Sequence, residues 1–264
     1  METLAPLRAR YGIDEVHLTG GEPSIHPQVC EHTAALTKAG YAVKMTTNGQ
    51  TELSRYRTCI GAGLKELNVS MHTLNPKTLG ALMSPPRSSS WGEQAITRQL
   101  ELLEAFTGEL TMKINTCVGA SEEEATKIAP LARASGAHWR VMKVLETSAA
   151  SEAAITRLCR TLGAEPLSAA LTRETSSCSI LMGTEDGFRF SVKLIRPLRL
   201  QAMCNGCPVD AEGKCFEFAY GPRIEAADKQ LLVRSCLYRS GAPFVLPSNQ
   251  YLNHPIAGET YDQR

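Results

Sequence analysis

The first 163 residues alternate between strand-like and helix-like patterns, and this alternation restricts the fold more than any other feature. Short runs rich in β-branched and apolar residues are separated by longer stretches in which apolar residues recur with helical spacing. The predicted strands are residues 14–19, 42–47, 65–70, 110–118 and 139–145. Because repeated strand–helix units need parallel strands joined by right-handed crossovers, we predict an α/β fold, either an open sheet or a barrel.

Three of the intervening stretches predict helices. Residues 27–38 end before Gly40, a residue type that suits the left-handed end of a helix. Residues 91–106 place their apolar side chains on one stripe. Residues 121–135 contain Pro130, so a kinked or broken helix is expected there.

Every predicted strand ends in polar or glycine-rich residues. In parallel α/β folds, functional groups gather at the C-terminal ends of the strands, which lie at the same edge of the sheet. The five ends are TGGE at 19–22, TTNG at 46–49, NVSMH at 68–72, KINT at 113–116 and KVLE at 143–146. We therefore expect these ends to line one shared pocket.

The first of these ends contains Gly20-Gly21-Glu22-Pro23. Glycines permit positive φ and the close approach of a ligand, and exposed backbone groups together with the Glu22 carboxylate suit a ligand ammonium group. The same residues could instead form a tight turn without a ligand. His17 lies beside this turn and is the histidine of most interest for a site.

The other polar ends allow two interpretations when each is taken alone. Thr46 and Asn48 could close their strand in an Asx-type turn, and Ser70 could cap the next segment. Lys113 and Asn115 are two residues apart and share one strand face. A lysine that faces a pocket needs an anionic partner such as a phosphate or carboxylate, whereas one that faces outward is only solvated.

The chain contains nine cysteines, which fall into two groups. We expect the scattered ones to be buried or free thiols. They are Cys30, Cys59, Cys117, Cys159 and Cys178.

The second group is a cluster with the spacing Cys204-x2-Cys207-x7-Cys215-x20-Cys236. In a reducing compartment such a cluster favours a metal over disulfides. Four thiolates suit either tetrahedral zinc or a [4Fe–4S] cluster, and the spacing alone does not choose between them.

The pattern changes after residue 163. Residues 178–194 predict a β-hairpin with Asp186-Gly187 at its turn, and a second hairpin is predicted around Ala227-Asp228. We accordingly predict two domains, residues 1–165 and residues 166–264.

Composition excludes several classes of protein. The 28 basic and 27 acidic residues give a net charge of +1, which offers no electrostatic basis for binding nucleic acid or an anionic membrane. The first residues lack the apolar segment of a signal peptide, and no run is long enough to span a bilayer. We expect a cytoplasmic protein with a sizeable core.

Four segments occur together in the sequence: LTGGEPS, TTNG, LNVSMHTLNP and KINTCV. In this order and spacing they resemble the radical S-adenosylmethionine superfamily, and within it the GTP 3′,8-cyclase branch of molybdenum-cofactor biosynthesis. The resemblance runs from about residue 14 to residue 146 and is moderate through the cysteine cluster. It implies a partial (β/α)6 TIM-like barrel whose first βα unit is missing, followed by a small α+β domain with an auxiliary [4Fe–4S] cluster.

The resemblance also implies roles for individual residues. The implied S-adenosylmethionine contacts are Gly20, Gly21, Glu22, Pro23, Ser70 and Leu145. The implied substrate contacts are His17, Thr46, Asn48, Lys113, Asn115 and Arg223. The implied ligands of the auxiliary cluster are Cys204, Cys207, Cys215 and Cys236, with zinc as the alternative metal.

Members of this superfamily cleave S-adenosylmethionine to a 5′-deoxyadenosyl radical, which abstracts a hydrogen atom from a substrate. The resemblance therefore implies the biosynthesis of a cofactor or natural product or the modification of a peptide. The substrate would be a small molecule or peptide, and a flavodoxin- or ferredoxin-type protein would donate electrons.

Some features depart from the family pattern. The Cys-x3-Cys-x2-Cys loop that binds the cleaving cluster does not occur in the sequence and would lie upstream of residue 14. The cyclase has an arginine where this chain has His17, and a pair of arginines is reduced to Arg223. We therefore expect a substrate other than GTP. The expected protein is either an enzyme whose cluster motif is encoded further upstream, or a degenerate, non-catalytic binding or scaffold protein. A structural-zinc protein with a small-molecule pocket is the third reading.

Overall fold

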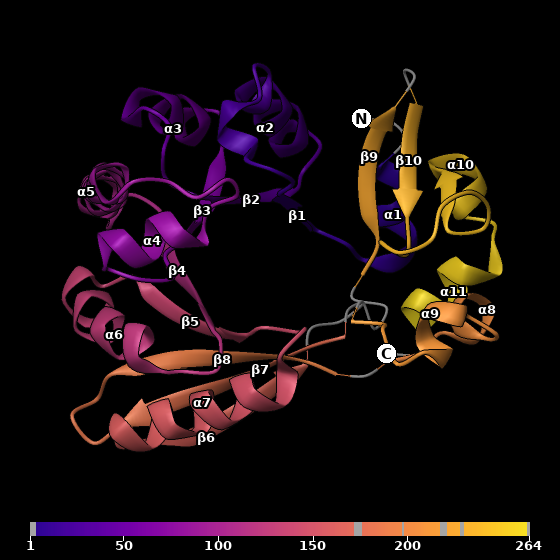
Figure 1. Ribbon diagram of the computed structural model, residues 1–264. Coiled ribbons are helices and arrows are strands. Elements are labelled where there is room, and N and C mark those ends of the chain that lie inside the picture. Colours follow the sequence, from indigo (N-terminus) through magenta and orange to yellow (C-terminus); the bar gives the residue numbers. More distant parts are fainter. Residues whose placement is uncertain (1–3, 172–175, 197, 217–220, 228–229, 263–264) are drawn as a thin grey trace. The chain divides into compact units, whose positions relative to one another are not determined.

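A computed structural model describes residues 4–171, 176–196, 198–216, 221–227 and 230–262. Its largest element is an eight-stranded sheet with the strand order β1-β2-β3-β4-β5-β8-β7-β6 (Figure 1). The first five strands pair in parallel. They are β1 (Glu15–Leu18), β2 (Ala42–Thr47), β3 (Leu64–Ser70), β4 (Thr111–Val118) and β5 (His138–Lys143). All five predicted strands are confirmed, and the fold is α/β with a partial TIM-like barrel.

Helices connect these strands. They are η1 (Pro23–Ile25), α2 (Val29–Lys38), α3 (Leu53–Gly61), α4 (Pro76–Leu82), α5 (Ser89–Phe106), α6 (Glu123–Ser135) and α7 (Ser148–Thr161). Gly40 has a φ of 87° just beyond α2, as its place after the helix predicts.

Three further strands complete the large sheet: β6 (Ala164–Leu171), β7 (Ser177–Thr184) and β8 (Arg189–Ile195). The first predicted hairpin is confirmed, since the backbone N–H of Thr184 donates to the carbonyl of Phe188 at 3.0 Å across the turn between β7 and β8.

The small domain contains a three-stranded antiparallel sheet in the order β11-β10-β9. Its strands are β9 (Arg223–Ala227), β10 (Gln230–Arg234) and β11 (Val245–Pro247). The second predicted hairpin is confirmed by the pairing of Ala227 with Gln230, although Asp228 lies outside the described residues. The remaining helices are α1 (Ala5–Tyr11), α8 (Gln201–Cys204), α9 (Pro208–Ala211), α10 (Ser248–Tyr251) and α11 (Pro255–Asp262).

Side chains of the five parallel strands alternate between two faces. The apolar face packs beneath the connecting helices (Figure 1), and burying each of its large side chains contributes about 1.5–3 kcal/mol. Its fully buried members are Val43, Met45, Leu67, Val69, Ile114, Trp139 and Val141.

The opposite face of these strands is polar, and we call it the polar face. The strands of a parallel sheet that is covered by helices on both sides are apolar throughout. The alternation seen here therefore indicates that one face of these strands is not covered by helices. The polar face consists of Glu15, His17, Lys44, Thr46, Glu66, Asn68, Ser70, Lys113, Asn115, Cys117, His138 and Arg140.

Two local expectations need correction, although a kink in the helix around Pro130 stays a prediction. The helix around Pro130 is not broken, because α6 is continuous and the packing of its buried face, which includes Ile128, offsets the cost of the proline. Cys30 and Cys59 are not free thiols, because the neighbouring helices α2 and α3 bring their Cα atoms within 4.6 Å of each other and the two cysteines form a disulfide. The expectation of free thiols is confirmed for Cys117, Cys159 and Cys178.

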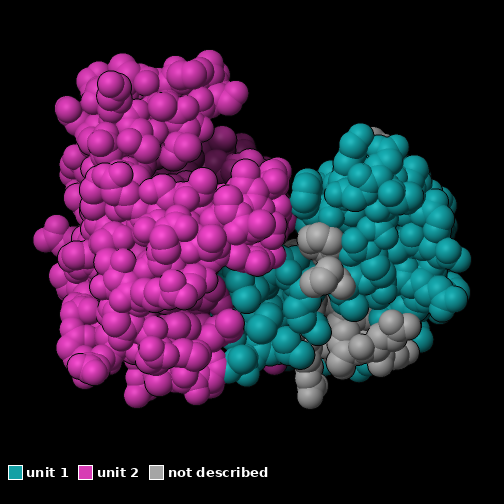
Figure 2. Space-filling view, turned by 60° about the horizontal axis from the view of Figure 1, so that its bottom comes forward, with its two compact units in different colours: residues 1–13, 169–179, 193–264 teal, residues 14–168, 180–192 magenta. Residues whose placement is uncertain are grey.

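The chain divides into two compact units (Figure 2). One contains residues 14–168 and 180–192, and the other contains residues 1–13, 169–179 and 193–264. The domain boundary predicted at residue 165 stays a prediction. Among the described residues, no helix is both long and apolar enough to cross a membrane.

Candidate functional site

The loop after β1 has an open backbone at its two glycines. Gly20 has a φ of 132°, a conformation that side chains rarely adopt. A Cβ built on Gly20 or on Gly21 would meet no other heavy atom within 4 Å. The turn is therefore shaped by glycine and leaves free space beside its backbone.

Glu22 holds this loop against the end of β2. Its Oε1 atom accepts hydrogen bonds from the backbone N–H of Ser24 at 3.1 Å, from the Ser24 hydroxyl at 2.6 Å and from the Thr47 hydroxyl at 2.8 Å. Its Oε2 atom accepts one from the backbone N–H of Asn48 at 2.6 Å. Because the carboxylate is occupied in this way, the groups left open to a ligand are the backbone atoms of the glycine turn.

The loop is also tied to α3. Arg55 donates hydrogen bonds to the carbonyl oxygens of His26 and Pro27 at 2.7 and 2.9 Å. The Tyr56 hydroxyl lies 2.7 Å from the Thr47 hydroxyl and is fully buried. The glycine turn thus rests on a support built from two strand ends and a helix.

His17 and Thr46 meet on the polar face. The Nε2 atom of His17 lies 2.7 Å from the Thr46 hydroxyl and 3.3 Å from the amide nitrogen of Asn68. These three residues come from β1, β2 and β3, so the structure brings together strand ends that the sequence predicted to be neighbours.

Lys113 lies on the polar face and has an anionic partner within the protein. Its Nζ atom is 2.7 Å from the Glu66 carboxylate. The Nζ atom of Lys44 lies 3.9 Å from the same carboxylate and 2.6 Å from the Glu15 carboxylate. Burial by itself would raise the pKa of Glu66, but the hydrogen bond from Lys113 and the positive charges of Lys113, Lys44 and Arg140 lower it overall. Sequence reasoning missed Glu66, whose position in the strand alternation could have indicated it.

Two buried amides on the polar face have unused acceptors. Asn68 is fully buried and Asn115 is 5% exposed, and among the described residues neither side-chain oxygen has a hydrogen-bond partner. Asn115 lies opposite Ser70 on β3 and opposite Arg140 on β5. An unsatisfied buried acceptor costs about 1–3 kcal/mol, which a ligand that donates to it would recover.

Arg140 is a site candidate that sequence reasoning missed. Among the described residues, its guanidinium makes no hydrogen bond or ion pair, although its charge influences the pKa values of Glu66, Lys113 and His138. The alternation in the last predicted strand, which puts Arg140 in phase with His138, could have found it.

Two histidines near these strand ends have lowered pKa values. Burial lowers the pKa of His72, whose Nδ1 atom accepts a hydrogen bond from the backbone N–H of Cys117 at 3.1 Å. Burial and the nearby charges of Lys113 and Arg140 lower the pKa of His138.

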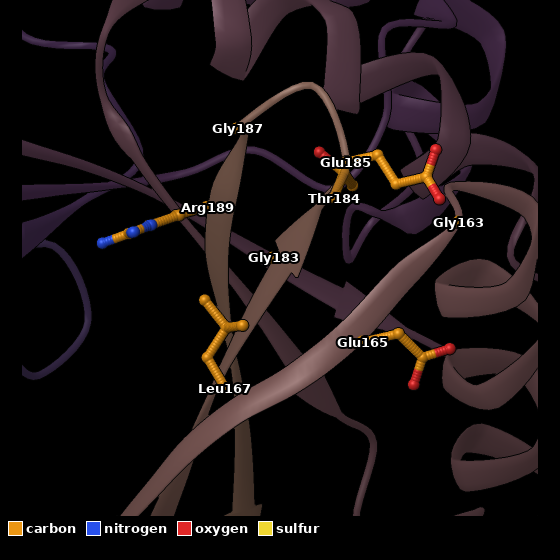
Figure 3. Close-up of a pocket in the computed structure, with 8 residues that line it drawn as sticks. All are labelled: Gly163, Glu165, Leu167, Gly183, Thr184, Glu185, Gly187 and Arg189. Carbon is orange, nitrogen blue, oxygen red and sulfur yellow. The ribbon is translucent and has the colours of Figure 1, made fainter.

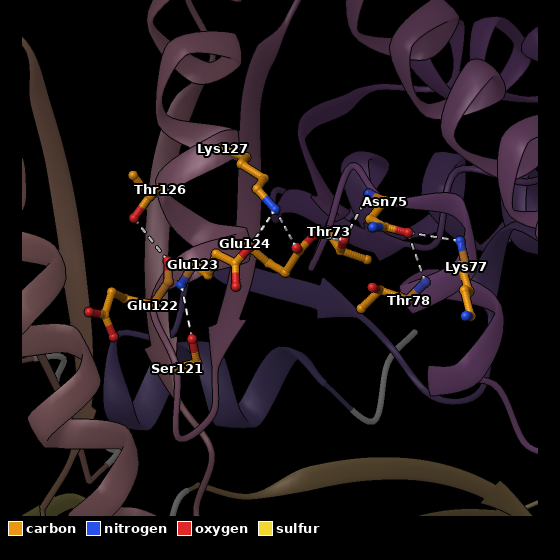
Figure 4. Close-up of polar contacts among 10 residues, drawn as sticks. All are labelled: Thr73, Asn75, Lys77, Thr78, Ser121, Glu122, Glu123, Glu124, Thr126 and Lys127. Atoms are coloured by element: carbon orange, nitrogen blue, oxygen red, sulfur yellow. Dashed lines mark hydrogen bonds and ion pairs between the residues drawn. The ribbon is translucent and has the colours of Figure 1, made fainter.

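The loops after β3 and β4 are joined by a polar clamp (Figure 4). The Thr73 hydroxyl accepts a hydrogen bond from the backbone N–H of Asn75 at 2.8 Å and donates one to Glu124 at the start of α6. Lys127 pairs with the same carboxylate at 2.9 Å. The Asn75 side chain in turn caps α4 through the backbone N–H groups of residues 77 and 78.

We expect Thr73→Val to lower the free energy of unfolding by about 2 kcal/mol, because it removes a partly buried hydrogen bond to a charged acceptor. The hydrogen bond from Thr73 is the largest cause that lowers the pKa of Glu124. A lowered carboxyl pKa contributes stability above the unfolded value that is lost as the pH falls through the folded value. The difference between Thr73→Val and wild type should therefore shrink in acid. Urea denaturation at each pH measures this difference. Thr78→Val is the control, because residue 78 takes part in the clamp through its backbone N–H and not through its side chain.

The remaining predicted contacts lie in different places. Ser70 ends β3, and its carbonyl accepts a hydrogen bond from Gln99 at 2.9 Å. Leu145 is half-buried and follows β5 before α7 begins. Arg223 begins β9 in the other compact unit, where it pairs with Arg234 in the strand register.

The four clustered cysteines line one small recess in their compact unit. Cys207 and Cys236 are buried, and Cys204 and Cys215 are half-buried. Burial is the largest cause that raises the pKa of Cys204. As the structure places them, no three or more His, Cys, Asp or Glu side chains in the described part of the chain are arranged to hold a metal ion. The recess therefore has the donor set of a metal centre but not its closed geometry.

Basic side chains accompany this recess. Arg199 is paired with Asp210, which lines the recess, and Arg239 lines it as well. Such cations would offset the negative charge that four thiolates bring to a metal centre.

A family model described as the radical SAM superfamily matches residues 1–127. The probable GTP 3′,8-cyclase of Thermococcus kodakarensis is 25% identical over 160 residues, which cover 61% of this chain and 50% of the relative. The GTP 3′,8-cyclase of Aquifex aeolicus is 23% identical over 250 residues, covering 89% of this chain and 76% of the relative. Thus the matches span between half and about three quarters of these relatives' length.

A solved structure, Streptococcus suis SuiB bound to precursor peptide SuiA, is similar with a TM-score of 0.46 at 18% identity. The similarity covers 61% of this chain and 39% of that chain. Residues 1–127 thus match the radical SAM superfamily model, and the chain is similar to GTP 3′,8-cyclases.

Proposed function

We propose that the chain binds S-adenosylmethionine at the C-terminal ends of its parallel strands. The observation that carries this proposal is the open Gly20-Gly21 turn, which Glu22 braces against β2. Its free backbone groups suit the ammonium and carboxylate of the methionine moiety. Pro23, Ser70 and Leu145 complete the proposed cofactor contacts, as the family resemblance implies.

The polar face is the proposed substrate surface. Arg140 offers a guanidinium for an anionic group, and Asn68 and Asn115 offer unused acceptors for N–H or O–H donors. His17 and Thr46 border these residues, and Asn48 follows at the end of β2. Lys113 contributes through its pair with Glu66, which fixes the charge pattern beside the substrate.

The proposed reaction is hydrogen abstraction from a small molecule or peptide in the biosynthesis of a cofactor or natural product or in peptide modification. S-Adenosylmethionine would supply the 5′-deoxyadenosyl radical in this chemistry. The chain's own part is to hold the methionine end at the glycine turn and to orient the substrate on the polar face. An electron donor of the flavodoxin or ferredoxin type is the proposed protein partner.

We also propose that Cys204, Cys207, Cys215 and Cys236 hold an auxiliary [4Fe–4S] cluster, with zinc as the alternative. The shared recess and the neighbouring arginines support a thiolate centre. Iron and sulfide analysis of anaerobically reconstituted protein separates the two metals. Serine variants of the four cysteines should lose the bound iron, and Cys159→Ser on α7 should keep it. Full iron retention in the serine variants would contradict this assignment.

The cofactor proposal is tested by calorimetric titration of the protein with S-adenosylmethionine under anaerobic conditions. We expect Gly20→Ala to weaken binding by at least about tenfold, because a side chain here strains the turn and intrudes on the open backbone. Gly108→Ala is a matched control, since Gly108 also has a positive φ of 95° and open space around it but lies away from the strand ends used here. The absence of binding by the wild-type protein, or equal losses in both variants, would contradict the proposed site.

A further inference from the structure

The strand β6 forms a free edge of the large sheet. Among the strands that the structure describes, it is the last in the order of the sheet, with β7 as its one neighbour. Seven of its eight residues are exposed, and only Ala164 is buried. A long exposed edge of this kind carries unpaired backbone groups that can recruit another strand, and proteins usually cover or shorten such edges.

The same strand carries two exposed leucines on one side. Leu167 is 53% exposed and Leu171 is 59% exposed, and both belong to the small set of large apolar side chains that are exposed in the described part of the chain. Because they are four residues apart in a strand, they point to the same face. Leu167 lies over Gly183 of β7, where a Cβ would come within 2.7 Å of its Cδ1 atom, and Figure 3 shows it beside the hairpin.

We propose that β6 pairs in an antiparallel manner with β6 of a second copy of this chain, centred on Ala169. The segment Leu167-Ser168-Ala169-Ala170-Leu171 is self-complementary about that centre. In this register Leu167 lies opposite Leu171 of the partner subunit, and Leu171 lies opposite Leu167 of the partner subunit. The exposed leucines of both copies then form one apolar stripe, as an isologous interface requires.

Pro166 agrees with the same pairing. A proline is tolerated in a sheet where its nitrogen faces a free edge, so alternate residues in phase with it, Ser168 and Ala170, direct their backbone groups outward. Ser168 then exchanges hydrogen bonds with Ala170 of the partner subunit, and Ala170 does so with Ser168 of the partner subunit. Ala169 consequently meets its own copy in a pair without hydrogen bonds, where side chains approach most closely.

The oligomeric state tests this proposal directly. Sedimentation velocity of the wild-type chain over a hundredfold range of concentration should show a monomer–dimer equilibrium. Leu167→Lys should weaken dimerisation by at least about tenfold because it places a charge in the apolar stripe. Leu82→Lys is the matched control, because Leu82 is 57% exposed but ends α4, and it should dimerise like the wild type. A wild-type monomer at every concentration, or equal effects of both lysine variants, would overturn the proposal.

The register is tested by cysteine cross-linking. Ala169→Cys should form an intermolecular disulfide between identical positions, because its Cβ atoms face each other across the two-fold axis. Ser168→Cys should cross-link poorly, because it lies opposite residue 170 of the other copy rather than its own equivalent. Mass spectrometry of the linked peptides identifies the pair. Cross-linking of Ser168→Cys that equals that of Ala169→Cys would exclude this register.

Discussion

Glu22→Ala is expected to remove measurable S-adenosylmethionine binding and to lower the free energy of unfolding by about 3 kcal/mol. The carboxylate accepts four hydrogen bonds from Ser24, Thr47 and Asn48, and hydrogen bonds to a charged group contribute about 1.5–3 kcal/mol each without being fully additive. Without them, the glycine turn loses its attachment to β2. Chemical denaturation and calorimetric titration measure the two effects separately.

Two further variants make this result specific. Glu22→Gln keeps one acceptor oxygen and should lie between the wild type and the alanine variant in both measurements. Glu31→Gln is the control, because it removes a carboxylate on α2 whose hydrogen bond, from Gln28 at 3.5 Å, is long. This variant should leave binding unchanged. If Glu22→Ala binds S-adenosylmethionine as tightly as the wild type, the glycine turn is not the cofactor site.

Glu66→Ala is expected to destabilise the protein by about 3–5 kcal/mol. Glu66 is 7% exposed, and its carboxylate lies within 2.7 Å of Lys113 and 3.9 Å of Lys44. Removing one partner of a buried ion pair leaves the other charge without compensation, and here the charge of Arg140 is also nearby. Urea denaturation of the single variant measures the loss.

The double variant Glu66→Leu with Lys113→Met should recover much of this loss, because replacing a buried pair by apolar side chains is often close to neutral.

The pH dependence of stability gives an independent check of the ion pair. Because the pKa of Glu66 is lowered in the folded protein, its contribution is present above the unfolded carboxyl pKa of about 4.3 and is lost as the pH falls through the folded value. A stability difference between wild type and Glu66→Gln that grows in acid would contradict the assigned ion pair.

Much of the fold could be predicted because the information is local. Each parallel strand is a short apolar or alternating run followed by a polar end, and the helices between them carry a stripe of apolar side chains. The hairpin turn at Asp186-Gly187 and the helix end before Gly40 depend on glycine's freedom at positive φ, which the sequence also displays. The roles of single polar residues depend on neighbours that are distant in the chain, and these were harder to predict.

Lys113 illustrates the difference. Its position indicated a need for an anion, but the partner could not be named, because Glu66 comes next to it only through the register of β3 against β4. Arg140 escaped notice for the same reason, and Asn68 was predicted only as part of a polar strand end, since a polar residue within a strand acquires meaning only when its neighbours on the same face are known.

By itself, the sequence determined the five parallel strands, the polar strand ends, the glycine turn and the cysteine cluster, because these follow from periodicity and residue type. Only the tertiary structure decided that Glu22 supports the turn from within and that Cys30 reaches Cys59. It also decided that β6 is left as an exposed edge. The physical reason is that hydrogen-bond partners, disulfides and free edges are set by which strands and helices become neighbours, and sequence periodicity specifies the faces of those elements but not their neighbours.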